Sequence, residues 1–129
     1  MRVLIACEFS GIVRDAFIAR GHEALSCDLL PSERPGPHHQ GDVRDVLGDG
    51  WDLMVAHPPC TDLAVSGARW FASKGDRPER ALDFVRLLLT APIPRIALEN
   101  PVSIISSRIR KPDQIVQPWW FGEGETKAT

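Results

Sequence analysis

The segment that most constrains this chain is an apolar run that stops at two consecutive prolines. Residues 51–60 read WDLMVAHPPC, so the apolar part leads directly into Pro58 and Pro59. Because proline has no backbone N–H to donate to a sheet ladder, a buried strand in this segment must end there. Cys60 is therefore predicted to lie on a stiff loop at the carboxyl end of a strand, where ligands bind in open α/β sheets.

Four further segments read as strands. RVLIACEF (residues 2–9) and PRIALENP (94–101) are continuous apolar runs, typical of strands that are buried on both faces of a parallel sheet. EALSCDLL (23–30) reads as a second short strand that ends near Asp28. QIVQPWWF (114–121) is expected to form a last strand at a sheet edge, since it contains a proline.

Two segments have helical periodicity. In SGIVRDAFIARGH, Ser10 is expected to cap a helix that ends near Gly21, and the apolar repeat consists of Ile12, Val13, Ala16 and Phe17. In PERALDFVRLLLTAP, Pro78 suits the first turn, Pro92 stops the helix, and the apolar stripe consists of Leu82, Val85, Leu88 and Leu89. The segment PSERPGPHHQG reads as a loop and DVRDVL as a short helix or turn. This alternation predicts an α/β fold with a doubly wound, mostly parallel sheet.

Composition limits the class of protein. A chain of 129 residues is expected to form one domain, residues 1–129, and its formal net charge of -2 gives no general case for nucleic-acid binding. No apolar run approaches the roughly 20 residues that span a bilayer, and the apolar start is too short for a signal peptide. Three cysteines without a close pair favour a reducing, cytoplasmic environment over disulfides. Neither the adjacent His38 and His39 nor His57 has the spacing of metal ligands, so no metal is expected.

Polar residues gather where the predicted strands end. The first strand is followed by CEFSG and then by a helix. The N-terminal N–H groups of this helix are expected to bind a polar or anionic group. Gly11 is the only glycine of the segment, so the segment is far from the full glycine pattern of a dinucleotide-binding motif. Asp28 is placed to accept hydrogen bonds from a ribose, and Asp42 is a second candidate for contacting a nucleoside. Both aspartates also suit ordinary turns.

Cys60 and Glu99 follow two strands of the same predicted sheet. A thiolate can attack an electron-poor carbon while a carboxylic acid protonates a ring nitrogen and so makes that carbon electrophilic. Glu99 would have to carry a proton near neutrality, and Cys60 would have to be a thiolate. The alternatives are that Cys60 is a buried structural cysteine and that Glu99 caps a helix.

The order of these motifs resembles the cytosine-5 DNA methyltransferases. ACEFSGIVRDAF resembles their Phe-x-Gly turn, CDLLPS resembles the acidic residue after the second strand, and GDVRDV is similar to the segment that contacts adenine. HPPCTDLAVSG resembles the nucleophile loop, and LENP resembles the Glu-Asn-Val motif that holds the target base. The resemblance covers about residues 3–102, and it implies a Rossmann-like domain that binds S-adenosylmethionine.

The resemblance also implies roles for residues. Cys60 would attack carbon 6 of cytosine, Glu99 would protonate or hydrogen-bond nitrogen 3, and carbon 5 would take the methyl group before losing its proton. A base in duplex DNA would first be flipped out of the helix. The residues implied in cofactor binding are Phe9, Ser10, Gly11, Asp28, Asp42 and Pro59. Those implied in contacting DNA or a cytosine nucleotide are Asn100, Arg108 and Arg110, and Arg69, from a basic stretch, is a further candidate for contacting phosphate.

The chain departs from the family pattern in several places. Thr61 stands where the family has glutamine, Pro101 replaces the valine of Glu-Asn-Val, and Ile12 and Val13 replace the second glycine region. No target-recognition domain follows, so we expect either a minimal relative, of a type associated with phages and their bacterial hosts, or a truncated product.

Other functions remain open at this point. A degenerate methyltransferase fold that only binds, as a decoy would, is one alternative, and another thiol chemistry on a pyrimidine nucleotide is a second. Arg69 and its basic neighbours are as well explained by a solvated helix entry as by phosphate contacts. The cluster Trp119-Trp120-Phe121 is expected to pack internally or to form a homodimer contact.

Overall fold

The computed structural model of the protein describes residues 1–59, 77–100 and 105–116. The chain divides into two compact units, of which the first comprises residues 1–58 with 88–98 and the second residues 59–87 with 99–129. Within the described residues, no helix is both long and apolar enough to cross a membrane.

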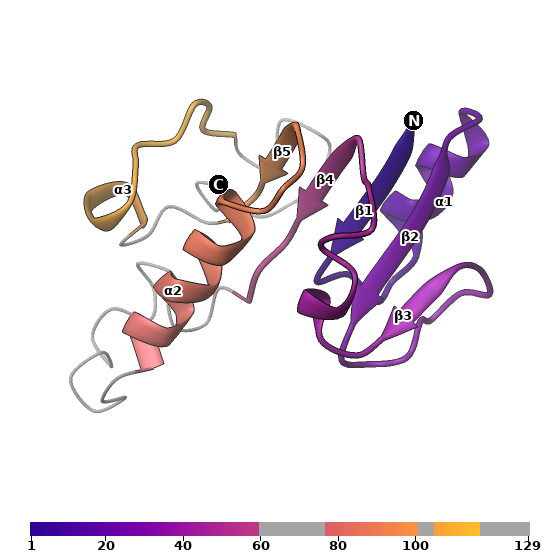
Figure 1. Ribbon diagram of the computed structural model, residues 1–129, viewed down its shortest axis with the longest axis horizontal. Helices are drawn as coiled ribbons and strands as arrows, with labels where there is room; N and C mark the ends of the chain where they lie inside the picture. Colours follow the sequence, from indigo (N-terminus) through magenta and orange to yellow (C-terminus); the bar gives the residue numbers. More distant parts are fainter. Residues whose placement is uncertain (60–76, 101–104, 117–129) are drawn as a thin grey trace. The chain divides into compact units, whose positions relative to one another are not determined.

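The first unit is built on a five-stranded parallel sheet. Its strands are, in chain order, β1 (Arg2–Ala6), β2 (Glu23–Asp28), β3 (His38–Gln40), β4 (Leu53–Ala56) and β5 (Arg95–Leu98). They lie side by side in the order β3-β2-β1-β4-β5, and every neighbouring pair is parallel (Figure 1). The predicted parallel α/β sheet is therefore confirmed.

The strand order changes direction at β1. From β1 the chain adds β2 and β3 on one side and then returns to add β4 and β5 on the other. The position between β1 and β4 is therefore a topological switch point. Open α/β sheets form their ligand crevice at such a point, just beyond the carboxyl ends of the strands.

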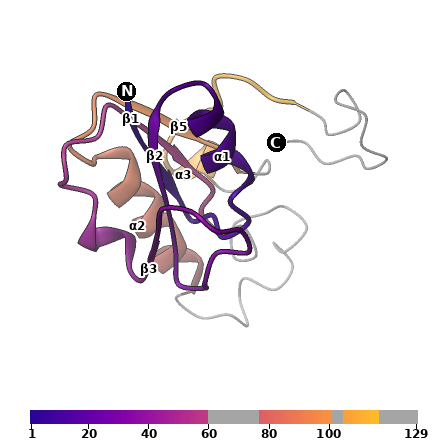
Figure 2. The ribbon, with the colours of Figure 1, turned by 90° about the vertical axis from the view of Figure 1, so that its right-hand side faces the viewer.

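The central strands are buried on both faces, as their continuous apolar sequences predict. On one face, Val3, Ile5 and Ala24 form a core against which Val13 and Phe17 of α1 (Ile12–Ala19) pack. Figure 2 shows α1 beside the strands that it covers, β1 and β2. Leu4, Met54 and Ala56, whose side chains alternate with those of the first face, are also fully buried.

Helix α1 differs from its predicted apolar stripe. Ile12 is 56 % exposed and Ala16 is also exposed, whereas Arg14 is completely buried. Gly11, in the left-handed conformation with φ 79°, is the capping residue, and Ser10 supports the turn from one position earlier. The helix ends as predicted, because Gly21 follows it with φ 86° and donates to the carbonyl of Ile18.

Two strand predictions need correction. Residues 38–40, predicted as loop, form β3, because they pair with Ser26, Cys27 and Asp28 along the free edge of β2. The second correction concerns β5, which was predicted to be buried but is half-exposed, with Ala97 on its exposed side. The turn after β3 contains a short 3-10 helix, η1 (Val43–Asp45), in the segment predicted as a short helix or turn.

The described part of the second unit contains most of helix α2 (Arg77–Leu89) and the short helix α3 (Ile105–Arg108). Pro78 lies in the first turn of α2, and its predicted stripe is largely correct, since Leu82, Val85 and Leu88 are fully buried. Leu89 is half-buried. Residues 114–116 are not in a strand, and the rest of the predicted strand over 114–121 lies outside the described residues.

Candidate functional site

The predicted cofactor-binding residues of the first unit lie where strands end. Phe9, Ser10 and Gly11 follow β1, and Asp28 is the last residue of β2. Ala6 pairs with Cys27 of β2 and with Ala56 of β4, so these strand ends share one edge of the sheet. This edge, at the end of β1, is the candidate functional site.

The turn from β1 into α1 is held by a buried carboxylate. Glu8 is only 7 % exposed, and its Oε1 accepts hydrogen bonds from the Ser10 hydroxyl at 2.8 Å and the Val13 amide at 2.9 Å. The Ser10 Oγ in turn accepts from the amide of Ile12 at 3.2 Å. The amides of Ile12 and Val13, the first two of α1, therefore donate within the turn and are not free to bind an anion.

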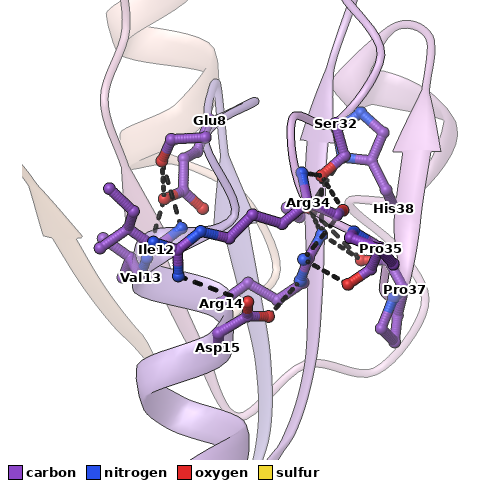
Figure 3. Close-up of polar contacts among 12 residues, drawn as sticks. Glu8, Ile12, Val13, Arg14, Asp15, Ser32, Arg34, Pro35, Pro37 and His38 are labelled. Atoms are coloured by element: carbon purple, nitrogen blue, oxygen red, sulfur yellow. Dashed lines mark hydrogen bonds and ion pairs between the residues drawn. The ribbon is translucent and has the colours of Figure 1, made fainter.

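The second oxygen of Glu8 has a different environment. Oε2 is buried, and among the described residues it has no hydrogen-bond partner. A buried acceptor without a donor costs free energy, so such an atom needs an explanation. In Figure 3 the Glu8 carboxylate lies at the amino end of α1, beside Val13.

Apolar side chains surround the same edge. Phe9 is 38 % exposed, and Leu29 and Leu30, which follow Asp28 directly, are 74 % and 53 % exposed. The carbonyl of Phe9 accepts a hydrogen bond of 2.8 Å from the amide of Glu33, so the turn after β1 is tied to the loop after β2. The edge therefore combines a few acceptor atoms with exposed apolar side chains.

The two predicted aspartates differ in their availability. Asp28 accepts from the amide of Leu30 through Oδ1 at 2.9 Å, which is a local turn, and its Oδ2 has no partner among the described residues. Asp42 caps η1, where the Arg44 amide donates to Oδ1 and the Arg44 guanidinium contacts both oxygens. The hydrogen bond from the Arg44 amide, more than the charge of Arg44, holds the pKa of Asp42 below its ordinary value. Asp28 is thus better placed for a ligand than Asp42.

A fully buried arginine, which the sequence interpretation missed, ties the loop after β2 to α1. Arg14 donates through Nε to Asp15 at 2.9 Å and through Nη1 to the hydroxyls of Ser26 and Ser32, each at 3.0 Å. Its Nη2 donates to the carbonyls of Arg34 and Pro35 (Figure 3). All five N–H donors of the guanidinium are therefore used, and these hydrogen bonds hold the loop against α1.

Two glycines make room for this guanidinium. A Cβ built on Gly11 or on Gly36 would lie 2.7 Å from Nη2 of Arg14, and both residues have positive φ. The guanidinium thus occupies a slot between the turn before α1 and the loop before β3.

His38 completes the network at β3. Its Nε2 lies 2.9 Å from the carbonyl of Leu30, which can only accept, so Nε2 carries the hydrogen. In the neutral ring, Nδ1 then accepts from the Ser26 hydroxyl at 2.7 Å. His39 pairs instead with Asp45 at 3.0 Å. Both histidines have structural partners.

The two described cysteines are unsuited to nucleophilic attack. Burial raises the pKa of Cys7 to about 12 and that of Cys27 to about 11, and the charge of Asp28 adds to both shifts. Cys27 is buried in the core, whereas Cys7 lies just beyond β1, is partly exposed and has φ 61°. A thiol with such a pKa is protonated at neutral pH and is a poor nucleophile.

The predicted catalytic and substrate-binding residues belong to the second unit or lie outside the described residues. Cys60, Arg69 and Trp119-Trp120-Phe121 lie outside. Glu99 and Asn100 directly follow β5 in the chain, and Pro59 follows Pro58, but all three belong to the second unit.

The two predicted substrate-binding arginines of the second unit are already paired. Arg108 forms an ion pair with Glu79 of α2, and Arg110 forms one with Asp113 at 2.8 Å. Neither arginine presents an unneutralised charge to a phosphate.

No protein-family model, no curated protein and no solved structure matches this chain.

Proposed function

We propose that the chain is an S-adenosylmethionine-dependent methyltransferase that acts on carbon 5 of cytosine, with Cys60 as nucleophile. The observation that carries the proposal is the Glu8 carboxylate at the amino end of α1. In dinucleotide-binding folds of this strand order, that helix end holds a pyrophosphate through free amides and the helix dipole. A buried carboxylate in its place repels phosphate and favours a cationic ligand.

The residues at this edge fit S-adenosylmethionine, which carries a sulfonium and an ammonium and has no phosphate. Glu8 and Asp28 each have an oxygen without a partner among the described residues, so both offer acceptors to donor groups of a ligand. Asp28 would hold the ribose hydroxyls, and Phe9 and Leu29 would cover apolar parts of the nucleoside. When bound, the cofactor supplies an electrophilic methyl group.

The chemistry on cytosine rests on Cys60 and Glu99 and on the resemblance that their motifs carry. Addition of the Cys60 thiolate to carbon 6, with transfer of a proton from Glu99 to nitrogen 3, makes carbon 5 electron-rich. Once carbon 5 has taken the methyl group, loss of the carbon-5 proton to a base would expel the thiolate, and loss of the proton on nitrogen 3 would restore the neutral ring. The raised pKa values of Cys7 and Cys27 support Cys60 as the nucleophile, because they leave the other two thiols protonated.

The first test is calorimetric titration of the whole chain with S-adenosylmethionine and S-adenosylhomocysteine. We expect micromolar binding that weakens about tenfold in Asp28→Asn, because hydrogen bonds to a charged acceptor contribute roughly 1.5–3 kcal/mol. Asp49→Asn makes the same charge change at an exposed position beyond the site and should bind like the wild type. No binding to a folded wild-type chain would contradict the proposal and favour a decoy or binding protein.

The second test addresses the nucleophile. An oligonucleotide containing 5-fluorocytosine should form a covalent adduct with the chain in the presence of S-adenosylmethionine, because fluorine cannot leave as a proton does. Cys60→Ser should abolish the adduct and leave cofactor affinity unchanged. An adduct that persists in Cys60→Ser, detected by mass spectrometry, would show that another residue attacks the base.

A further inference from the structure

We propose that the first unit has a second binding site, at the edge of β2 beside Ala24, for a small neutral ring that carries an N–H next to an acceptor atom. A pocket of about 340 Å³ lies there, lined by residues that include Ala24, Leu25, Ile18, Pro37 and Trp51. This volume is within the usual range of small-molecule sites. Ala24 is near the amino end of β2, whereas the candidate functional site lies at the carboxyl ends, so the proposal does not depend on the proposed function.

The backbone of Ala24 faces the edge of β2 that points away from β1. Successive residues of a strand direct their backbone N–H and C=O groups to opposite sides of it. The amide of Glu23 donates to Met1, on the β1 side, at 3.0 Å, and the amide of Ser26 donates to Pro37, on the β3 side, at 3.2 Å. Ala24 therefore faces the same side as Ser26. The pairing with β3 begins only at Ser26, so Ala24 lies beyond the end of β3 (Figure 1).

Two local features stop the ladder before it reaches Ala24. In the same register, the N–H of Ala24 would donate to the carbonyl of Pro35, and residue 37 would donate to the carbonyl of Ala24. Pro37 has no N–H, and the carbonyl of Pro35 accepts instead from Nη2 of Arg14 at 3.1 Å (Figure 3). Among the described residues, the N–H and C=O of Ala24 have no hydrogen-bond partner, although Ala24 is only 3 % exposed. A buried backbone pair of this kind is rare and needs a partner.

The two groups of Ala24 define the partner that can pair with them. A donor and an acceptor on the same side of one residue match a ligand that presents an acceptor beside an N–H, as a lactam or an amino-substituted azine ring does. An extended peptide also offers these groups. A strand that continued past Ala24 would meet β3, however, because the amide of Ser26 already donates to Pro37. The site therefore suits a compact ring and not a strand.

The walls of the pocket suit the faces of such a ring. They include the apolar side chains of Ile18 from α1, Leu25 from β2 and Pro37 from the loop before β3. Ile18 is 40 % exposed and Leu25 is half-buried, so both retain apolar surface that a ligand can cover. A polar backbone pair between apolar walls is the usual composition of a small-molecule site.

The arginine that lines the pocket argues against an anionic ligand. Arg2 donates through Nε to Glu23 at 3.0 Å and through Nη1 to the carbonyl of Gly50 at 3.2 Å. Its guanidinium also lies over the ring of Trp51, 4.6 Å from the ring centre. Arg2 is therefore already paired and is not free to bind a phosphate or a carboxylate, which favours a neutral ring over a nucleotide.

The experiment is a two-dimensional amide NMR titration of the whole chain with isocarbostyril, a neutral bicyclic lactam with an N–H beside its carbonyl. N-methyl-isocarbostyril has the same rings and lacks the donor, so it is the matched control ligand. We expect isocarbostyril to bind with a Kd in the millimolar range or below and to shift the amide of Ala24 most strongly. The N-methyl compound should bind about tenfold more weakly, because it cannot donate to the carbonyl of Ala24.

Two variants test the pocket from its two sides. Ile18→Trp fills it from α1, and Ile12→Trp makes the same change at an exposed position of the same helix outside the pocket. Pro37→Ala supplies an N–H that can pair with the carbonyl of Ala24, and Pro31→Ala is its control in the same loop. We expect Ile18→Trp and Pro37→Ala to weaken binding of isocarbostyril by about tenfold or more, and both controls to stay within about twofold of the wild type.

Three results would overturn the proposal. The first is no shift of the Ala24 amide up to the solubility limit of isocarbostyril, which would leave water as the partner of Ala24. The second is equal affinity for isocarbostyril and its N-methyl derivative, which decides the matter on the wild type alone if a variant does not fold. The third is wild-type affinity in a folded Ile18→Trp or Pro37→Ala chain. None of these results bears on the binding of S-adenosylmethionine at the opposite edge of the sheet.

Discussion

Replacement of Arg14 by methionine should remove the hydrogen bonds that hold the loop between β2 and β3 against α1. Arg14 is completely buried and donates to the hydroxyls of Ser26 and Ser32, the carbonyls of Arg34 and Pro35, and the carboxylate of Asp15. Methionine has a similar length and fills part of the same slot, so the variant removes the donors and the charge while it keeps much of the packing.

The expected loss in the free energy of unfolding depends on which of the hydrogen-bond acceptors of Arg14 can be hydrated after the substitution. The ion pair between Arg14 and Asp15 contributes little to this loss, because Asp15 is 37 % exposed and still has an ion pair with Arg34 at 3.7 Å. Ser26 is fully buried; its hydroxyl keeps His38 as acceptor, but its oxygen loses Arg14 as donor, and a buried polar atom that loses its partner costs about 1–3 kcal/mol. The loop carbonyls can be rehydrated if the loop moves, so we expect a total loss of about 3 kcal/mol in the free energy of unfolding. For a chain of this length, that loss lowers the melting temperature by about 11 °C.

Urea denaturation measures the free energy, and hydrogen exchange reports the loop. Exchange at the amide of Glu33, which donates to Phe9, should become faster in Arg14→Met. Arg14→Lys keeps the charge but has only three donors from one nitrogen, and should recover less than half of the loss. Arg20→Met alters an exposed residue of the same helix and should stay within about 0.5 kcal/mol of the wild type. If Arg14→Met also stays within that range, the guanidinium does not hold the loop.

Two more predictions concern the glycines and the thiols. Substitution by alanine should leave the free energy of unfolding nearly unchanged at Gly48, which has open space around it, and should lower it by about 1 kcal/mol at Gly21, where only φ 86° opposes a side chain. The loss should be clearly larger at Gly36, where the Cβ would also contact Arg14. Equal losses at the three glycines in thermal melts would refute a role for the slot. Because burial raises the pKa of Cys7 to about 12 and that of Cys27 to about 11, both thiols should resist a thiol reagent at pH 8 until the chain unfolds. The unfolded chain releases these protons at lower pH than the folded one, so the free energy of unfolding should fall as the pH rises from about 9 towards 12, and a flat profile would contradict the shifts.

The sheet could be predicted from the sequence because its central strands are specified locally. Pro58 stops β4 whatever surrounds it, and the continuous apolar runs of β1 and β4 require burial on both faces. The stripe of α2 was predicted for the same reason, since a repeat at helical spacing has one stable environment. These features depend on neighbours within a few positions of the chain.

The errors arise where a residue's role depends on distant parts of the chain. His38 and His39 have no preference for a strand, and β3 forms because Ser26 to Asp28 of β2 offer a free edge. β5 has the sequence of a buried strand, yet it is half-exposed, because among the described residues only β4 pairs with it. The position of a strand within a sheet is a property of the topology and cannot be obtained from its own four residues.

The loop before β3 does contain a signal for a buried donor. Pro35, Gly36 and Pro37 have three carbonyls but only one N–H, so this segment cannot satisfy itself by backbone hydrogen bonds. Either water or a side chain with several donors can supply the difference, and arginine has five donors. The sequence therefore leaves the donor open, and the choice of Arg14 depends on the approach of α1 to the loop, which only the structure shows.

Glu8 and Arg14 differ in how completely the protein pairs their buried polar groups. Both are charged residues buried beside the Gly11 turn, where a charge is costly unless it is paired. The buried charge of Arg14 is fully compensated, because it has a carboxylate, two hydroxyls and two carbonyls as hydrogen-bond partners. For Glu8 it leaves one oxygen without a described partner. The buried charge of Arg14 is fully paired and one oxygen of Glu8 is not, and Glu8 lies at the strand end where open α/β sheets form ligand crevices, which supports the proposal that this edge binds a ligand.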